Sequence, residues 1–152
     1  MNPDRPRLDQ VNIVSGNLDA SIAFYRRLGL EIGEDRVWRT QSGTHHVTAG
    51  SAAAGSTLGL DLDSVAFAQH WNKGWQGSTD LRGRVVVGFE LASRAAVDAV
   101  YADLIGAGHV GLQKPYDAFW GSRYAIVLDP DGIAVGLMSP PSPEHRSTPP
   151  EV

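Results

Sequence analysis

Polar side chains recur at alternate positions of several short apolar stretches, where a ligand could reach them. Each stretch is typical of a β-strand, so its polar groups share one face and its branched apolar groups share the other. The polar faces combine hydrogen-bonding groups and two carboxylates with very small residues, which is typical of a cavity for a neutral or cationic ligand. The alternative is a face that is solvated or covered by a partner chain. The polar residues are Gln10, Asn12, Asp61 and Glu90, and the small ones are Gly59, Gly88, Ala134 and Gly136.

Tryptophans are the second group of candidate binding residues. Trp71 and Trp75 stand four residues apart in a long connection, Trp38 lies in a predicted strand, and Trp120 precedes a predicted hairpin. Aromatic rings can stack on the flat part of a small molecule, which contributes about 0.5–1.5 kcal/mol beyond burial. The alternative is that these tryptophans belong to the core or to a dimer interface.

Histidines are the residues that could bind a metal ion or act as a base. His45 and His46 are adjacent, so on a strand they point to opposite faces and cannot easily bind one ion together. Only one of them could enter a cavity, and we assign His46 to it. His70 is a further candidate for a general base. The chain has no cysteine, which excludes disulfides, thiol catalysis and thiolate metal sites.

The first half of the chain predicts the elements that position the first of these residues. Asn17 is a suitable helix N-cap and Gly29 a suitable left-handed C-cap, with apolar residues at helical spacing between them. The spacing therefore predicts a helix over 18–28. A strand over 8–14 precedes this helix, and three β segments follow it, over 30–39, 45–50 and 57–62.

The second half repeats this plan. A strand over 84–91 leads to the N-cap Ser93 and to a helix that ends at Gly106 or Gly108. The apolar pattern of this strand and helix matches that of the first pair, which indicates an internal repeat of βαβββ type. The last strand keeps one face nearly bare, and such a face often lines a space where something else approaches. The strands after the helix are predicted over 109–113, 124–128 and 133–138, with the turn Asp129-Pro130-Asp131-Gly132 between the last two.

The remaining segments connect or flank these two modules. A connection over 63–83 is rich in glycine and tryptophan, and its middle, SVAFAQHW, favours a short helix. Connections of this length often carry function. We therefore expect one domain over 8–139, with module one over 8–62 and module two over 84–139. Residues 1–7 are expected to be a flexible arm, and the proline-rich residues 140–152 a disordered tail.

Two stretches resemble the vicinal oxygen chelate superfamily, which includes glyoxalase I, bleomycin-resistance proteins and extradiol dioxygenases. They are VNIVSGNLDASIAFYRRLGLEIG and WGSRYAIVLDPDGIAVGLMSP. The helix motif followed by Leu-Gly and the DPDG hairpin are specific as a pair. The resemblance implies an α+β fold, in which two βαβββ modules form curled mixed sheets around a cavity, usually in a homodimer.

The resemblance also implies four metal-ligand positions, one on the first and one on the last strand of each module. In this sequence they fall on Gln10, on or near Asp61, on Val86 and on Gly136. The last two have no side-chain donor. One amide and one carboxylate would hold a divalent ion weakly, because hard cations take six or more oxygens and zinc has three or four protein ligands. We therefore expect a metal-free site and no cofactor.

Composition narrows the class of protein. With 152 residues and 42% hydrophobic residues, the chain has enough apolar material for a globular core. A net charge of −4 disfavours a general nucleic-acid binder. The N-terminus, MNPDRPR, has no apolar segment, and no apolar run approaches the roughly 20 residues that span a bilayer. A soluble, cytoplasmic protein without membrane or nucleic-acid partners is expected.

These patterns predict a metal-free, dimeric protein that binds a small aromatic or drug-like molecule, with antibiotic resistance by sequestration as its role. Its ligand-binding residues would come from the polar and tryptophan groups above, together with His46. One alternative is a metal-dependent lyase, isomerase or dioxygenase that uses Gln10, Asp61 and a histidine such as His46. Another is an interaction module whose open sheets bind a second chain. The sequence does not identify the ligand or establish a reaction.

Overall fold

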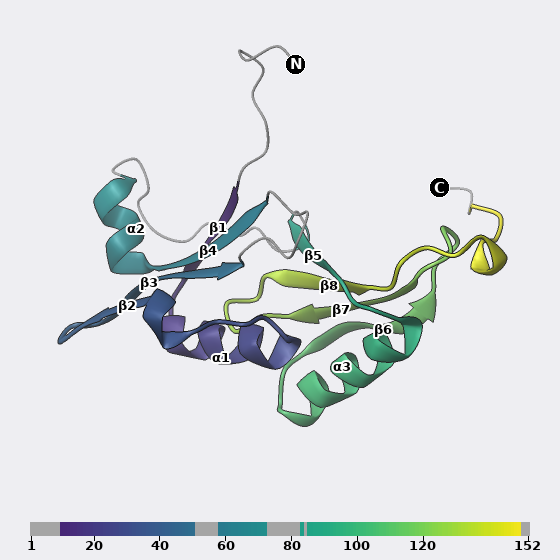
Figure 1. Ribbon diagram of the computed structural model, residues 1–152, viewed down its shortest axis with the longest axis horizontal. Helices are drawn as coiled ribbons and strands as arrows, with labels where there is room; N and C mark the ends of the chain where they lie inside the picture. Colours follow the sequence, from purple (N-terminus) through teal and green to yellow (C-terminus); the bar gives the residue numbers. More distant parts are fainter. Residues whose placement is uncertain (1–9, 51–57, 73–82, 84, 150–152) are drawn as a thin grey trace, which may run out of the picture. The chain divides into compact units, whose positions relative to one another are not determined.

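Two compact units make up the chain in the computed structural model, Met1–Ser78 and Thr79–Val152. The structure describes residues 10–50, 58–72, 83 and 85–149 (Figure 1). Each unit contains one four-stranded mixed sheet, so the predicted α+β architecture of two similar modules is confirmed. The arm over 1–7 and residues 73–82 of the predicted connection lie outside the described residues.

The sheet of the first unit has the order β1-β4-β3-β2, with β1 parallel to β4 and the other neighbours antiparallel (Figure 1). Helix α1 packs against β3 and β4. The predicted short helix in the connection is present as α2, which contacts β1, β3 and β4. The elements are β1 (Gln10–Ser15), α1 (Leu18–Leu28), the 3-10 helix η1 (Glu34–Arg36), β2 (Val37–Thr40), β3 (Gly43–Gly50), β4 (Gly59–Ser64) and α2 (Val65–Trp71).

Helix α1 begins and ends where its capping residues predict. The side chain of Asn17 accepts a hydrogen bond from the backbone N–H of Ala20, and Gly29 has a left-handed φ of 116°. All four apolar residues of the predicted stripe are buried and belong to the core of the first unit. They are Leu18, Ile22, Tyr25 and Leu28.

The segment after α1 differs from the predicted strand over 30–39, because residues 30–33 form neither helix nor strand and the 3-10 helix η1 follows them. Arg26 donates two hydrogen bonds to the carbonyl oxygen of Ile32 and one to the carboxylate of Glu34. These contacts hold the chain in a turn, so β2 starts only at Val37. Hydrogen bonds from Arg26 and Arg39 also lower the pKa of Glu34.

The second unit has the sheet order β5-β8-β7-β6, with β5 parallel to β8 (Figure 1). Ser93 caps α3, as predicted, and the helix ends at Gly106. Strand β6 starts later and runs longer than the predicted strand over 109–113. The elements are β5 (Val86–Glu90), α3 (Arg94–Gly106), β6 (Gly111–Asp117), β7 (Arg123–Leu128), β8 (Ala134–Met138) and the 3-10 helix η2 (Pro143–His145). No helix in the described part of the chain has the length and apolar character needed to cross a bilayer.

Strand pairing follows the same register in both sheets, which supports the internal repeat. In each unit the strand before the helix pairs in parallel with the last strand of the module, β1 with β4 and β5 with β8. The last strand also has an antiparallel neighbour, β3 or β7, and the register of this pairing is the same in both units. Asp61 is therefore equivalent to Gly136, and His46 to Tyr124. The matched pairs are Gln10–Gly59 with Val86–Ala134, and Asp63–His46 with Met138–Tyr124.

The nearly bare face of β8 was predicted to line a space, and this interpretation needs correction. Gly136 is buried, and a Cβ atom at this position would lie 2.9 Å from the hydroxyl oxygen of Tyr124. Tyr124 lies on the neighbouring strand β7, diagonally across from Gly136. What approaches the bare backbone is thus a ring of the chain itself, which sequence alternation within one strand cannot reveal.

The tail also differs from the prediction, because residues 140–149 have defined structure. The backbone N–H of Ser142 donates to the carbonyl oxygen of Gly121 at 3.1 Å, and that of Ser147 donates to Phe119 at 3.0 Å. Trp120 and Arg146 form an isolated antiparallel bridge. The loop before β7 therefore supplies backbone partners that the proline-rich composition does not reveal.

Replacement of Gly121 by alanine is expected to detach this tail and to lower the free energy of unfolding by about 1–2 kcal/mol. Gly121 has φ +100°, and its added Cβ atom would lie 2.4 Å from the backbone oxygen of Ser142. Hydrogen exchange at Ser142 and urea denaturation measure the two effects. Gly43→Ala is the control, because Gly43 has φ +126° but no atom within 4 Å of an added Cβ. If both substitutions lowered stability equally and the amide of Ser142 stayed protected from hydrogen exchange, the close approach of Ser142 to Gly121 would be contradicted.

Candidate functional site

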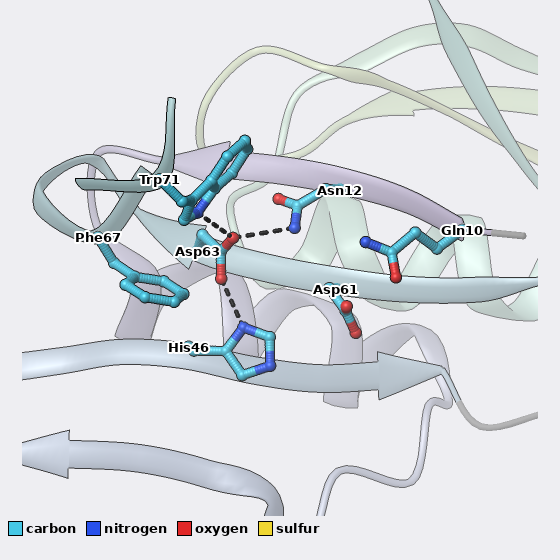
Figure 2. A pocket seen from close by; sticks show the side chains of 7 residues that line it. All are labelled: Gln10, Asn12, His46, Asp61, Asp63, Phe67 and Trp71. Atoms are coloured by element: carbon cyan, nitrogen blue, oxygen red, sulfur yellow. Dashed lines mark hydrogen bonds and ion pairs between the residues drawn. The ribbon is translucent and has the colours of Figure 1, made fainter. Parts of the chain in front are cut away.

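An open pocket of about 560 Å³ lies in the first unit, on the sheet face that carries the predicted polar residues. Strands β1, β3 and β4 contribute the polar side chains, and helix α2 contributes two aromatic rings (Figure 2). The strands bring the polar residues together because they are neighbours in the sheet. The pocket is lined by Gln10, Asn12, His46, Asp61, Asp63, Phe67 and Trp71.

Five of these lining residues were predicted from the sequence, and register explains how they meet. Asn12 on β1 is the direct partner of Asp61 on β4, and Gln10 lies two residues before it on the same face. His46 on β3 reaches the pocket from the other side of β4. Trp71 comes from the last turn of α2.

Asp63 organises the pocket, although the sequence analysis did not select it. Its side chain is only 2% exposed. One carboxylate oxygen accepts hydrogen bonds from Nδ2 of Asn12 at 2.9 Å and from Nε1 of Trp71 at 3.1 Å. The other oxygen accepts from Nδ1 of His46 at 2.5 Å. Figure 2 shows these three side chains converging on Asp63 from two strands and a helix.

The two missed residues, Asp63 and Phe67, each had a signal in the sequence. Asp63 follows Asp61 by two positions in LGLDLDS, so the two carboxylates share a strand face. Phe67 precedes Trp71 by four positions in the predicted short helix, which places both rings on one helix face. Neither signal identifies the three donors, because these come from distant parts of the chain.

One ring nitrogen of His46, Nε2, remains available to a ligand. Its Nδ1 donates to Asp63, so in the neutral ring Nε2 has a lone pair and can accept a hydrogen bond. The side chain of His46 is 29% exposed, and Nε2 has no hydrogen-bond partner among the described residues. A carboxylate on one side of an imidazole fixes its tautomer and ring orientation.

Three further oxygen-bearing groups remain without partners in the described part of the pocket. Neither Gln10 nor Asp61 forms a side-chain hydrogen bond or ion pair there, and Figure 2 shows both beside the Asp63 cluster. The amide of Asn12 uses Nδ2 for Asp63, and its Oδ1 atom is buried without a partner. Unpaired buried acceptors are uncommon in proteins, so this oxygen is a candidate for an interaction that the protein alone does not supply.

Trp38, which was predicted to bind the ligand, lies instead in a neighbouring pocket of about 320 Å³. Its ring centroid is 5.2 Å from that of Phe67, edge to face, and 4.8 Å from that of His45. Phe67 lines both pockets. His70, the candidate base, lines this second pocket. The two adjacent histidines line different pockets, but both pockets include Phe67 of α2, so both side chains lie on the same face of the sheet. The prediction that they point to opposite faces is wrong, because the register shift between Trp38 and Arg39 leaves His45 as an extra residue that interrupts the alternation.

Two of the other predicted site residues, Glu90 and Trp120, belong to the second unit. Trp75 falls outside the described residues. Glu90 is exposed on β5 in the second unit. Trp120 packs edge to face against Phe119 and Tyr124, with centroids 5.2 and 5.5 Å away, so the structure places it in an aromatic cluster of the second unit.

The equivalent face of the second unit has different chemistry. Where the first unit has Gln10, Asp61 and His46, the second has Val86, Gly136 and Tyr124. Burial raises the pKa of Tyr124, with a smaller contribution from Tyr116.

Two of the four positions that the family resemblance assigns to metal ligands, Val86 and Gly136, have no side-chain donor. Within the described ranges, no three acidic or histidine side chains form a group that could hold a divalent metal ion. Gln10, Asp61 and Nε2 of His46 are the side-chain donors that remain in the pocket, since Nδ1 of His46 donates to Asp63. In the second unit, Gly136 stands at the position equivalent to Asp61, and the ring of Tyr124 packs against its backbone. The described residues thus lack a group of three acidic or histidine ligands of the kind that zinc sites use.

Comparisons with known proteins agree with this architecture. The sequence matches the glyoxalase/bleomycin resistance protein/dioxygenase superfamily over residues 7–137. No curated protein matches the chain significantly. Several solved structures share the fold at low sequence identity.

Three of these structures illustrate the similarity. A family enzyme from Burkholderia phytofirmans is 18% identical, covers 88% of this chain and 98% of its own, and has a TM-score of 0.68. A glyoxalase/bleomycin resistance protein/dioxygenase from Nocardioides is 20% identical, covers 98% and 91%, and has a TM-score of 0.65. A lactoylglutathione lyase from Agrobacterium tumefaciens is 18% identical, covers 90% and 95%, and has a TM-score of 0.61. The superfamily match spans most of the sequence, and the chain therefore belongs to the glyoxalase/bleomycin resistance protein/dioxygenase superfamily.

Proposed function

We propose that the chain binds a small organic molecule in the pocket of the first unit, without a metal ion. The observation that supports this proposal is the Asp63 cluster, in which one buried carboxylate orients side chains from β1, β3 and α2. Side chains that are already fixed lose little entropy when a ligand binds. A volume of about 560 Å³ is within the range of small-molecule sites.

The proposed ligand has a flat apolar part, as in an aromatic or drug-like compound. Trp71 is 49% exposed although its indole nitrogen is held by Asp63, so its ring is both oriented and accessible. Phe67 lies one helical turn earlier on the same face.

Sequestration of such a compound, including an antibiotic, is the proposed role, and a homodimer is the proposed assembly. Light scattering that finds only a 16.3 kDa species would contradict the dimer.

Titration of the full chain with a panel of aromatic antibiotics and other flat aromatic compounds tests the binding function. A saturable change in tryptophan fluorescence is expected with at least one compound. Trp71→Ala is expected to weaken that binding about tenfold, since stacking contributes about 0.5–1.5 kcal/mol and 1.4 kcal/mol is tenfold. Trp38→Ala is the matched control, because Trp38 is 48% exposed but lines the other pocket. No saturable change across the panel would contradict the proposal.

A second candidate is an enzyme that moves a proton, such as a lyase or isomerase. The observation that favours it is the contact between His46 and Asp63, because the carboxylate orients the ring and Nε2, which has no partner among the described residues, can act as a general base. A lactoylglutathione lyase shares this fold. Elemental analysis of protein purified without chelators shows whether such an enzyme would use a metal ion. Stoichiometric zinc, nickel, manganese or iron would contradict a metal-free site.

A further inference from the structure

We propose that the pocket selects its ligand by a hydrogen-bond donor, and that the preferred class is an aromatic compound with a protonated amine. This inference rests on the proposed binding function and adds the charge of the ligand. It follows from how the pocket distributes its donors and acceptors, which only the structure reveals.

Most hydrogen-bond donors that line the pocket already donate to the carboxylate of Asp63. Four lining residues carry a side-chain N–H group, and three of these groups already donate to the carboxylate of Asp63. Among the described lining residues, only the amide of Gln10 keeps all its hydrogens for a ligand. A ligand that needs donors from the protein therefore finds almost none.

Acceptors, in contrast, remain available in the same pocket. Both carboxylate oxygens of Asp61 lack partners among the described residues, and so do Nε2 of His46 and the amide oxygen of Gln10. Figure 2 shows the carboxylate of Asp61 beside the ring of His46, with the amide of Gln10 nearby. The buried Oδ1 atom of Asn12 adds negative partial charge. An ammonium group, with three donors and no acceptor, complements this set.

Charge and aromatic rings reinforce this preference. Two carboxylates line the pocket, and no lysine or arginine is among its lining residues. An anionic ligand would therefore meet like charge without a compensating cation. The rings of Phe67 and Trp71 can contact both the flat part of the ligand and its cationic group.

Isothermal titration calorimetry at pH 7 with three compounds that share one ring system tests this inference. The compounds are 1-naphthylmethylamine, 1-naphthylmethanol and 1-naphthoate, which differ mainly in charge. The amine is expected to bind at least tenfold more tightly than the carboxylate, with the alcohol between them. Asp61→Asn, which keeps the shape of the side chain, is expected to reduce the advantage of the amine about tenfold.

Glu31→Gln is the matched control, because it removes one negative charge from an exposed residue that lines neither pocket. This variant is expected to keep the preference of the wild type. Thermal unfolding shows whether Asp61→Asn is folded, and a normal transition is expected since Asp61 has no partner in the described structure. Equal affinity for the three compounds would overturn the charge selection and leave the binding function standing. No binding by these compounds or by the wider aromatic panel would overturn both.

Discussion

Asp63→Ala is expected to lower the free energy of unfolding by about 2–4 kcal/mol, the largest effect of any single change in the pocket. The substitution removes the acceptor of three hydrogen bonds and leaves the side chains of Asn12, His46 and Trp71 without it. Trp71 and His46 are partly exposed, so water can replace the lost acceptor and limits the loss of stability. The amide of Asn12 has a buried oxygen, so water replaces its acceptor less easily. Urea denaturation followed by far-UV circular dichroism measures the change.

Asp61→Ala is the matched control for this experiment. Asp61 lies on the same face of β4, two residues earlier, and forms no hydrogen bond or ion pair in the described structure. Its removal is expected to change stability by less than about 0.5 kcal/mol. Asp63→Asn is expected to give an intermediate loss, because the amide keeps one acceptor oxygen but turns a donor toward at least one of the three donors. Equal stability of Asp63→Ala and Asp61→Ala would show that the cluster does not hold the pocket together.

Local signals account for the parts of the fold that the sequence predicted. Asn17 and Gly29 fix the ends of α1 through contacts within a few residues, so its bounds could be predicted without the rest of the chain. Alternation in β1 and β4 has a period of two, so it assigns Gln10, Asn12 and Asp61 to one face without any tertiary information.

Contacts between distant segments account for what the sequence did not predict. Asp63 stands next to the predicted end of a strand, where a carboxylate is ordinarily solvated, and its donors lie 51 residues before, 17 before and 8 after it. Trp38 was assigned to the ligand because of its residue type. Trp38 is the direct partner of His46 and lies on the same face of the sheet, but it stands on β2, the strand farthest from β1, and lines the second pocket. Strand order in the sheet depends on distant pairings, which no local pattern specifies.

The divergence of the two units shows the same distinction between local and distant information. Strand patterns predicted the repeat, and strand register confirms that Asp61 and Gly136 are equivalent. The sequence also indicated that Gly136 leaves space beside the backbone. It could not indicate that Tyr124, at the position equivalent to His46, fills this space. The first unit thus keeps the more polar of the two faces, and the second has closed the equivalent position with an aromatic ring.

Gly136→Ala is accordingly expected to lower the free energy of unfolding by about 1–3 kcal/mol, as overpacking of a closed site does. The new Cβ atom would lie 2.9 Å from the hydroxyl oxygen of Tyr124 and 3.1 Å from its Cε2 atom. The ring cannot easily retreat, because it also packs against Tyr116 and Trp120, at centroid distances of 6.0 and 5.5 Å. Urea denaturation of the full chain measures the loss.

Gly88→Ala is the matched control, because Gly88 is the direct partner of Gly136 on the neighbouring strand β5. No atom lies within 4 Å of a Cβ added there, so this change is expected to be neutral or to stabilise by up to about 1 kcal/mol. Tyr124→Phe removes the nearest clashing atom, so Gly136→Ala should be less destabilising in that background than in the wild type. A double-mutant cycle without coupling, or equal effects at Gly88 and Gly136, would mean that Tyr124 does not close this face in solution.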